Sequence, residues 1–199
     1  MSHEIVCWQV DAFTDEPFRG NPAAVVFLEH DAPEAWMQSV GNEMNLAETA
    51  FLRKRPDGEY DLRWFTPVRE VDLCGHATLG SAHALWESGR LPADATAAFH
   101  TRSGRLTAVR RGEWIEMDFP AVPVAAAPPP SDLLESLGAP ARFVGVNKMD
   151  YLVELESEAA VRGLEPDLGR LARVEARGTI VTARGAGEGT DFVSRFFVP

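Results

Sequence analysis

The sequence predicts an α+β protein built from two folding units, and three observations point to this class. Short strand-like runs recur along the 199 residues, with apolar and polar positions alternating or with β-branched and aromatic residues enriched. Fewer segments carry apolar residues at helical spacing. The stretch from Phe119 to Pro130 has no charged residue and is rich in proline, which favours extended polyproline geometry. We therefore expect a first unit over 1–119, a linker over 120–130 and a second unit over 131–199.

The first unit is expected to be mostly strands. Strand patterns cover 5–13, 23–28, 45–52, 60–66, 97–101, 105–110 and 113–118. A helix is predicted at 33–44, where Pro33 suits the first turn, and a central helix at 75–87, which opens with a glycine and continues as an apolar run. Cys7 lies in an apolar strand and is expected to pack in the core.

The second unit is expected to alternate strands with short helices. Helical patterns begin at 131 and cover 157–163 and 165–171, and strand patterns cover 143–146, 151–155, 179–183 and 191–198.

Composition excludes several classes of protein. No apolar run approaches the roughly 20 residues of a membrane span, and the first residues lack the features of a signal peptide. The net charge of −11 argues against a nucleic-acid partner. Dinucleotide and phosphate-loop signatures are missing, and the five histidines show no metal-ligand spacing. With only two cysteines no disulfide framework is implied, so we expect a cytoplasmic protein without a metal site.

The most informative segment, 72–80, places a thiol, two glycines and an imidazole at the start of the predicted central helix. A helix N-terminus offers unpaired backbone N–H groups that suit a small anion, and a histidine there can move protons near neutral pH. Gly75 permits close approach of a ligand to the backbone. The alternatives are that His76 is a structural residue of the helix start and that Cys74 is a small buried hydrophobe.

Two further residues could carry chemistry. Glu48 lies in a strand flanked by apolar residues, where burial would raise the pKa of its carboxyl group and suit it to proton transfer. Alternatively, Glu48 faces solvent, because strand faces alternate. Asn21 stands between Gly20 and Pro22, which indicates a turn first and a ligand-binding side chain second.

The ordered set of motifs resembles the PhzF family of phenazine-biosynthesis-like isomerases. The motifs are VDAFT (10–14), GNPAAVV (20–26), NLAETAF (45–51), WFTP (64–67), DLCGHATLG (72–80) and FVSRFF (192–197). The resemblance implies a diaminopimelate epimerase-like fold of two similar halves, each a curved, mostly antiparallel sheet around a central helix.

The same resemblance implies a role for each site residue. Glu48 would be the general acid/base that moves a proton on a small anionic, carboxylate-bearing metabolite, and His76 would assist. The backbone around Gly75 and Ala77 would bind the substrate's anionic group, with Cys74 at a position where the epimerases carry a catalytic cysteine. No cofactor or metal is implied.

The chain departs from the family pattern after Phe197. A second catalytic motif and a second central helix are expected there, yet the sequence stops at Pro199. We therefore expect an incomplete second half with an uncovered apolar sheet face, so that residues 131–199 are either stabilised by self-association, as in a homodimer, or loosely packed. The alternative function is that of an inactive homologue that binds small acids or dimerises.

Overall fold

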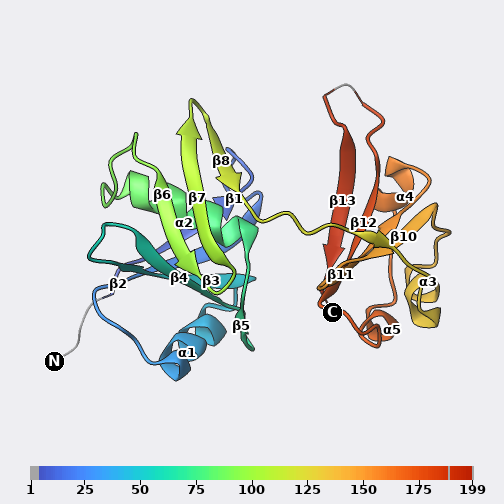
Figure 1. Ribbon diagram of the computed structural model, residues 1–199, viewed down its shortest axis with the longest axis horizontal. Helices are drawn as coiled ribbons and strands as arrows, with labels where there is room; N and C mark the ends of the chain where they lie inside the picture. Colours follow the sequence, from blue (N-terminus) through green and yellow to red (C-terminus); the bar gives the residue numbers. More distant parts are fainter. Residues whose placement is uncertain (1–4, 188, 199) are drawn as a thin grey trace. The chain divides into compact units, whose positions relative to one another are not determined.

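The computed structural model describes residues 5–187 and 189–198. Its contacts divide the chain into two compact units, Met1–Phe119 and Pro120–Pro199 (Figure 1). Each unit carries its own hydrophobic cluster of buried residues, so each is described separately.

The first unit is one sheet with two helices (Figure 1). Its elements are β1 (Cys7–Ala12), β2 (Asn21–Leu28), α1 (Glu34–Met44), β3 (Glu48–Lys54), β4 (Tyr60–Phe65), β5 (Glu70–Val71), α2 (Gly75–Glu87), β6 (Ala97–Thr101), β7 (Gly104–Arg111) and β8 (Trp114–Asp118). The strand order is β1-β2-β3-β4-β6-β7-β8, with β5 paired to β4. Among the described strands of this unit only the β2–β3 and β4–β6 pairs are parallel.

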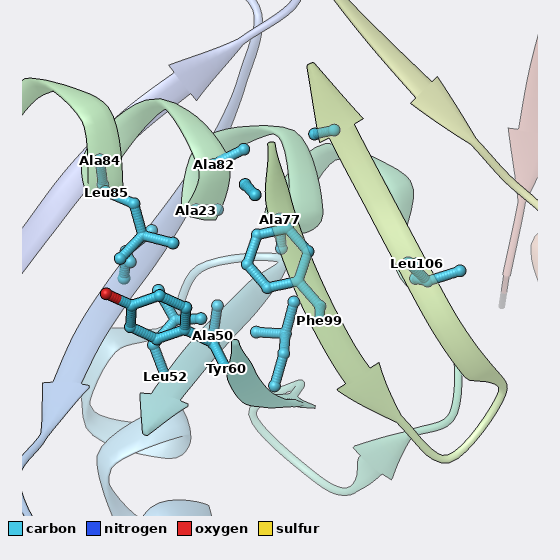
Figure 2. Packing of buried hydrophobic residues seen from close by; sticks show 14 of the residues in the cluster. Ala23, Ala50, Leu52, Tyr60, Ala77, Ala82, Ala84, Leu85, Phe99 and Leu106 are labelled. Carbon is cyan, nitrogen blue, oxygen red and sulfur yellow. The ribbon is translucent and has the colours of Figure 1, made fainter. Parts of the chain in front are cut away.

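Helix α2 is the centre of the first unit, and the sheet curls around it (Figure 1). Small residues let the helix approach the strands closely: a Cβ added at Gly80 would lie 3.4 Å from the Cβ of Val10. Figure 2 shows Ala77, Ala82 and Leu85 of α2 among strand residues such as Phe99. This close packing of small side chains fixes the position of the first turn of α2 against the sheet.

The other face of the sheet is covered in part by α1. Because successive side chains of a strand point to opposite faces, Val26 and Phe51 face away from α2 and pack with Met37 of α1 and Phe65. The approach is close, since a Cβ added at Gly41 would lie 3.1 Å from that of Phe65.

The second unit pairs a smaller sheet with three short helices. Its elements are β9 (Ala125–Ala126), α3 (Ser131–Leu137), β10 (Phe143–Val146), β11 (Asp150–Glu154), α4 (Glu158–Arg162), α5 (Leu168–Leu171), β12 (Gly178–Arg184) and β13 (Phe192–Phe197). The strand order is β13-β12-β11-β10-β9, and only β11–β12 is parallel among the described pairs. Val153 and Val181 pack with Leu133, Val161 and Leu171 of the helices.

The opposite face of the second sheet carries an apolar row. The register aligns Ala126, Gly145, Leu152, Ile180 and Phe196 across all five strands. These residues alternate with the buried valines beneath the helices, so they lie on the other face. The Phe196 side chain is exposed.

The α+β class and the mostly antiparallel pairing are as the sequence predicts, but several boundaries differ. The strand expected at 45–52 begins only at Glu48, because Asn45 adopts a left-handed conformation (φ 50°) and ends α1 with its backbone N–H bonded to Gly41. The helix expected at 165–171 is confined to α5, because Asp167 caps it by accepting from the N–H of Arg170 and Pro166 disfavours helix in the residue before it.

Two further expectations need correction. The segment 120–130 contains β9, which pairs with β10 and so belongs to the second unit's sheet. Cys7 is exposed and does not pack in the core, because it lies on an edge strand with its side chain away from the α2 face that Trp8 and Val10 share.

The two-residue strand β5 is too short to give an alternating pattern in the sequence. No helix among the described residues is long and apolar enough to cross a membrane.

Candidate active site

Glu48 is the first residue of β3, and its position on the strand determines where it points. It alternates with Thr49, so it shares a face with Ala50, which packs in the core around α2. Burial is substantial but incomplete, with 19% of the side chain exposed. The carboxyl group therefore lies on the α2 side of the sheet and stays accessible to a small ligand.

The first turn of α2 supplies the second part of the site. Cys74 precedes the helix in an extended conformation, and its carbonyl accepts from both the backbone N–H and the hydroxyl of Thr78. The N–H groups of Gly75, His76 and Ala77 have no carbonyl four residues earlier within the helix. A Cβ added at Gly75 would meet no atom within 4 Å, so this turn borders open space.

The fold brings Glu48, Cys74 and His76 together. The Oε2 atom of Glu48 lies 3.3 Å from Nε2 of His76. On the other side of the ring, Nδ1 of His76 lies 3.5 Å from Sγ of Cys74. The Nε2 atom of His76 is buried. It makes no hydrogen bond to any group among the described residues, because its alignment with Glu48 falls outside hydrogen-bond geometry. His76 Nε2 is thus available to bond a ligand that lies beside the two side chains.

Burial dominates the electrostatics of the site. It raises the pKa of Glu48, an effect that a hydrogen bond from the Cys74 thiol partly offsets. It lowers the pKa of His76, and a hydrogen bond to the Pro22 carbonyl acts in the opposite direction. Because burial disfavours the charged imidazole, the close approach of Glu48 and His76 is not a fixed ion pair. Burial, and next the charge of Glu48, raise the pKa of the Cys74 thiol, which therefore stays protonated at neutral pH.

Asn21 is the first residue of β2 and not part of the turn that the sequence predicts, because it pairs with Ala12 of β1, and it lies at the same edge of the sheet. Ala23 is paired with Glu48, so the start of β2 lies beside the start of β3. Gly20 makes this turn possible: its φ is +79°, and an added Cβ would lie 2.2 Å from the carbonyl oxygen of Ala12. Asn21 is half-buried next to Pro22, whose backbone carbonyl acts to raise the pKa of His76.

The remaining predicted position, Ala77, contributes only backbone, because its side chain is fully buried in the α2 core. Sequence reasoning missed the Pro22 carbonyl as a partner of His76. The Gly-Asn-Pro turn signal was visible, but its proximity to α2 depends on strand pairing.

The most voluminous pocket described lies elsewhere and contains none of the predicted site residues. It has a volume of about 360 Å³ and lies on the α1 side of the sheet, where Met37, Phe51, Leu62, Arg53 and Arg102 line it. Each of these two arginines is already paired with carboxylates, Arg53 with Asp31 and Asp61, and Arg102 with Glu34, Glu70 and Asp72.

Comparisons with known proteins agree with this architecture. The family model described as "Phenazine biosynthesis-like protein" matches residues 10–199. An uncharacterized isomerase of Halalkalibacterium halodurans is 50% identical over 191 residues, which is 96% of this chain and 72% of that protein.

Solved structures give the same result. A PhzF-family protein from Enterococcus faecalis superposes with a TM-score of 0.86 at 40% identity, covering 97% of this chain and 73% of that one. A predicted epimerase from Pseudomonas aeruginosa superposes with a TM-score of 0.71 at 25% identity, covering 88% of this chain and 68% of that one.

Proposed function

The chain belongs to the phenazine biosynthesis-like (PhzC-PhzF) family of isomerases, and from this membership and the site geometry we propose that it relocates a proton on a small carboxylate-bearing metabolite. The observation that carries the proposal is the 3.3 Å separation of Glu48 Oε2 and His76 Nε2 at the start of α2. A proton acceptor and a proton donor so placed can act on one bound molecule.

Each part of the site has a role in this reaction. A C–H bond next to a carboxylate loses its proton more readily when the developing negative charge is stabilised. The N–H groups in the first turn of α2, which have no acceptor carbonyl within the helix, would supply that stabilisation, and the helix dipole adds to it. Glu48 takes the proton from carbon, and its raised pKa brings it closer to the range that favours proton transfer at neutral pH.

His76 then assists the transfer in its neutral form. Burial lowers the pKa of its imidazole, so the ring can accept or donate a hydrogen bond without carrying a fixed charge. Its free Nε2 atom points to the same space as the Glu48 carboxylate. Neither step transfers electrons, so the proposed reaction includes no redox cofactor.

A hydrogen–deuterium exchange experiment tests the proposal. The protein is incubated in D₂O with a panel of small amino and hydroxy acids, and loss of substrate C–H signal is followed by NMR. We expect exchange with the wild type, loss of exchange with Glu48→Gln, and unchanged exchange with Glu43→Gln, which alters an exposed carboxylate of α1. Exchange that persists in Glu48→Gln would remove Glu48 from the proposed role.

A second candidate is a protein that binds small acids without turnover. The open space at Gly75 favours it, because the nearby N–H groups, which have no acceptor carbonyl within the helix, would bind an anion without any help from Glu48. Calorimetric binding of an acid that undergoes no exchange in D₂O, with the same affinity in Glu48→Gln, would support this candidate over the isomerase.

A further inference from the structure

We infer that Glu48, Cys74 and His76 also form a binding site for a zinc-type divalent cation, and that such an ion blocks the site. Carboxylate, thiolate and imidazole are the three side-chain types that bind Zn²⁺ in proteins. The bond from Cys74 to the ion would replace the S–H bond, and the thiol proton would be released to solvent. One donor atom from each residue lies within 4.8 Å of the others. The binding of the ion does not depend on the proposed isomerase activity. The inhibition by the ion rests on that proposed activity.

Two pairs of donor atoms have the separation that a tetrahedral ion requires, one pair at each nitrogen of the His76 ring. With zinc–ligand bonds of about 2.0 to 2.3 Å, neighbouring donor atoms lie about 3.3 to 3.6 Å apart. The pairs Glu48 Oε2–His76 Nε2 and Cys74 Sγ–His76 Nδ1 are separated by 3.3 and 3.5 Å. A single ion takes only one nitrogen of the ring, so one side chain must turn toward the nitrogen that the other contacts. Glu48 is the longest and most exposed of the three and is the one free to turn.

The surroundings leave room for a fourth ligand. Cys74 and His76 are buried, so the protein shields two of the donors from competing water. The space beside Gly75 is open. A site with three protein ligands and one open position then holds a water molecule or the carboxylate of a bound acid. The ion would occupy both groups that the proposed reaction needs and so would stop proton transfer.

A second cluster shows why donor spacing alone is insufficient. Asp57, Glu59 and His100 also lie within 4.8 Å of one another. However, Arg55 pairs with Asp57 and Arg105 pairs with Glu59, and the cluster has no sulfur ligand. Guanidinium groups already neutralise those carboxylates, whereas no arginine or lysine among the described residues pairs with Glu48. The Glu48 cluster is therefore the one we assign to the ion.

Cobalt substitution tests the assignment, because Co²⁺ bound to a thiolate absorbs in the near ultraviolet. Tag-free protein treated with a chelator is titrated with CoCl₂ and then with ZnCl₂. The matched control is Cys7→Ser, which removes the other cysteine, an exposed one. We expect the thiolate absorption in the wild type and in Cys7→Ser, its displacement by Zn²⁺, and its loss in Cys74→Ser. Absorption that survives in Cys74→Ser or disappears in Cys7→Ser would overturn the site.

Two further measurements keep the result independent of variant folding and of activity. Zinc-edge X-ray absorption of the wild type should show one sulfur at about 2.3 Å and lighter ligands at about 2.0 Å, and a shell without sulfur would refute the assignment. Since loss of an outer-shell partner alone costs about 10- to 100-fold in metal affinity, Glu48→Gln should weaken binding by about 100-fold.

Where deuterium exchange is present, saturating Zn²⁺ should abolish it in the wild type. Full exchange under saturating Zn²⁺ would refute the inhibition. If the protein shows no exchange even without Zn²⁺, the proposed function is wrong, and the absorption spectra alone test the metal site.

Discussion

The carboxylate of Glu48 and the imidazole of His76 come within 3.3 Å of each other although they belong to a strand and a helix separated by β4 and β5. Burial lowers the pKa of His76, so the imidazole carries no fixed positive charge opposite the carboxylate. The pair is consistent with a site that keeps two proton-transferring groups ready for a ligand.

His76→Gln should slow substrate deuterium exchange by about 100-fold, because a positioned acid–base group contributes about 10²- to 10⁴-fold. The double variant Glu48→Gln/His76→Gln should be little slower than Glu48→Gln alone, since residues that act as a unit are not additive. His83→Gln, on the same helix but further from its start, is the control and should exchange at the wild-type rate. Additive losses in the double variant would show that the two residues act separately.

Gly20→Ala should destabilise the first unit more than Gly58→Ala does. Both glycines have positive φ, so each substitution carries the cost of a left-handed alanine, about 1 kcal/mol. Only at Gly20 would the new Cβ also collide with a backbone oxygen, at 2.2 Å, whereas Gly58 has no atom within 4 Å. Denaturant unfolding followed by tryptophan fluorescence reports on this unit, because all five tryptophans lie within residues 1–119. Equal losses for the two variants would contradict the assigned turn.

Asp150→Asn should destabilise the second unit by about 1.5–3 kcal/mol, the range for hydrogen bonds to charged groups. Asp150 is 2% exposed and accepts two bonds from Arg177, so the asparagine would leave part of a buried network unsatisfied. Hydrogen exchange of β11 and β12 measures the loss. Glu156→Gln breaks only the exposed pair with Arg142 and should change stability by less than about 0.5 kcal/mol. Similar effects from both variants would mean that the Asp150 pair is as weak as a surface pair.

Acid should remove a stabilising contribution of Glu59. Hydrogen bonds from Arg105 and then His100 lower the pKa of Glu59 from 4.5 to about 2. As the pH falls, the unfolded chain binds this proton first, so the contribution is complete above about pH 4.5 and is lost as the pH approaches about 2. The difference in thermal midpoint between wild type and Glu59→Gln should therefore shrink over this interval. Glu43→Gln, outside the ion pairs of the described residues, should follow the wild type throughout, and a pH-independent Glu59→Gln difference would refute the coupling.

Local signals predicted most elements, for reasons that are visible in particular residues. The strand pattern at 97–101 matches β6, and the pattern at 143–146 matches β10, because alternation and β-branched or aromatic residues act over neighbouring positions. The pattern erred where a single backbone angle decided the outcome, as at Asn45, or where a cap shortened a helix, as at Asp167. Cys7 shows the other limit, since an apolar strand does not reveal which of its faces meets a helix.

By itself, the sequence determined the α+β class, the family motifs and the helix start that carries Cys74, Gly75 and His76, because these depend on neighbouring residues and their spacing. Only the tertiary structure decided that Glu48 faces α2, that Asn21 lies at the same edge of the sheet, and that a thiol, an imidazole and a carboxylate meet. The reason is physical: strand register and the packing of α2 on the sheet arise from contacts between segments far apart in the chain, and a shift of one residue would turn Glu48 to the opposite face.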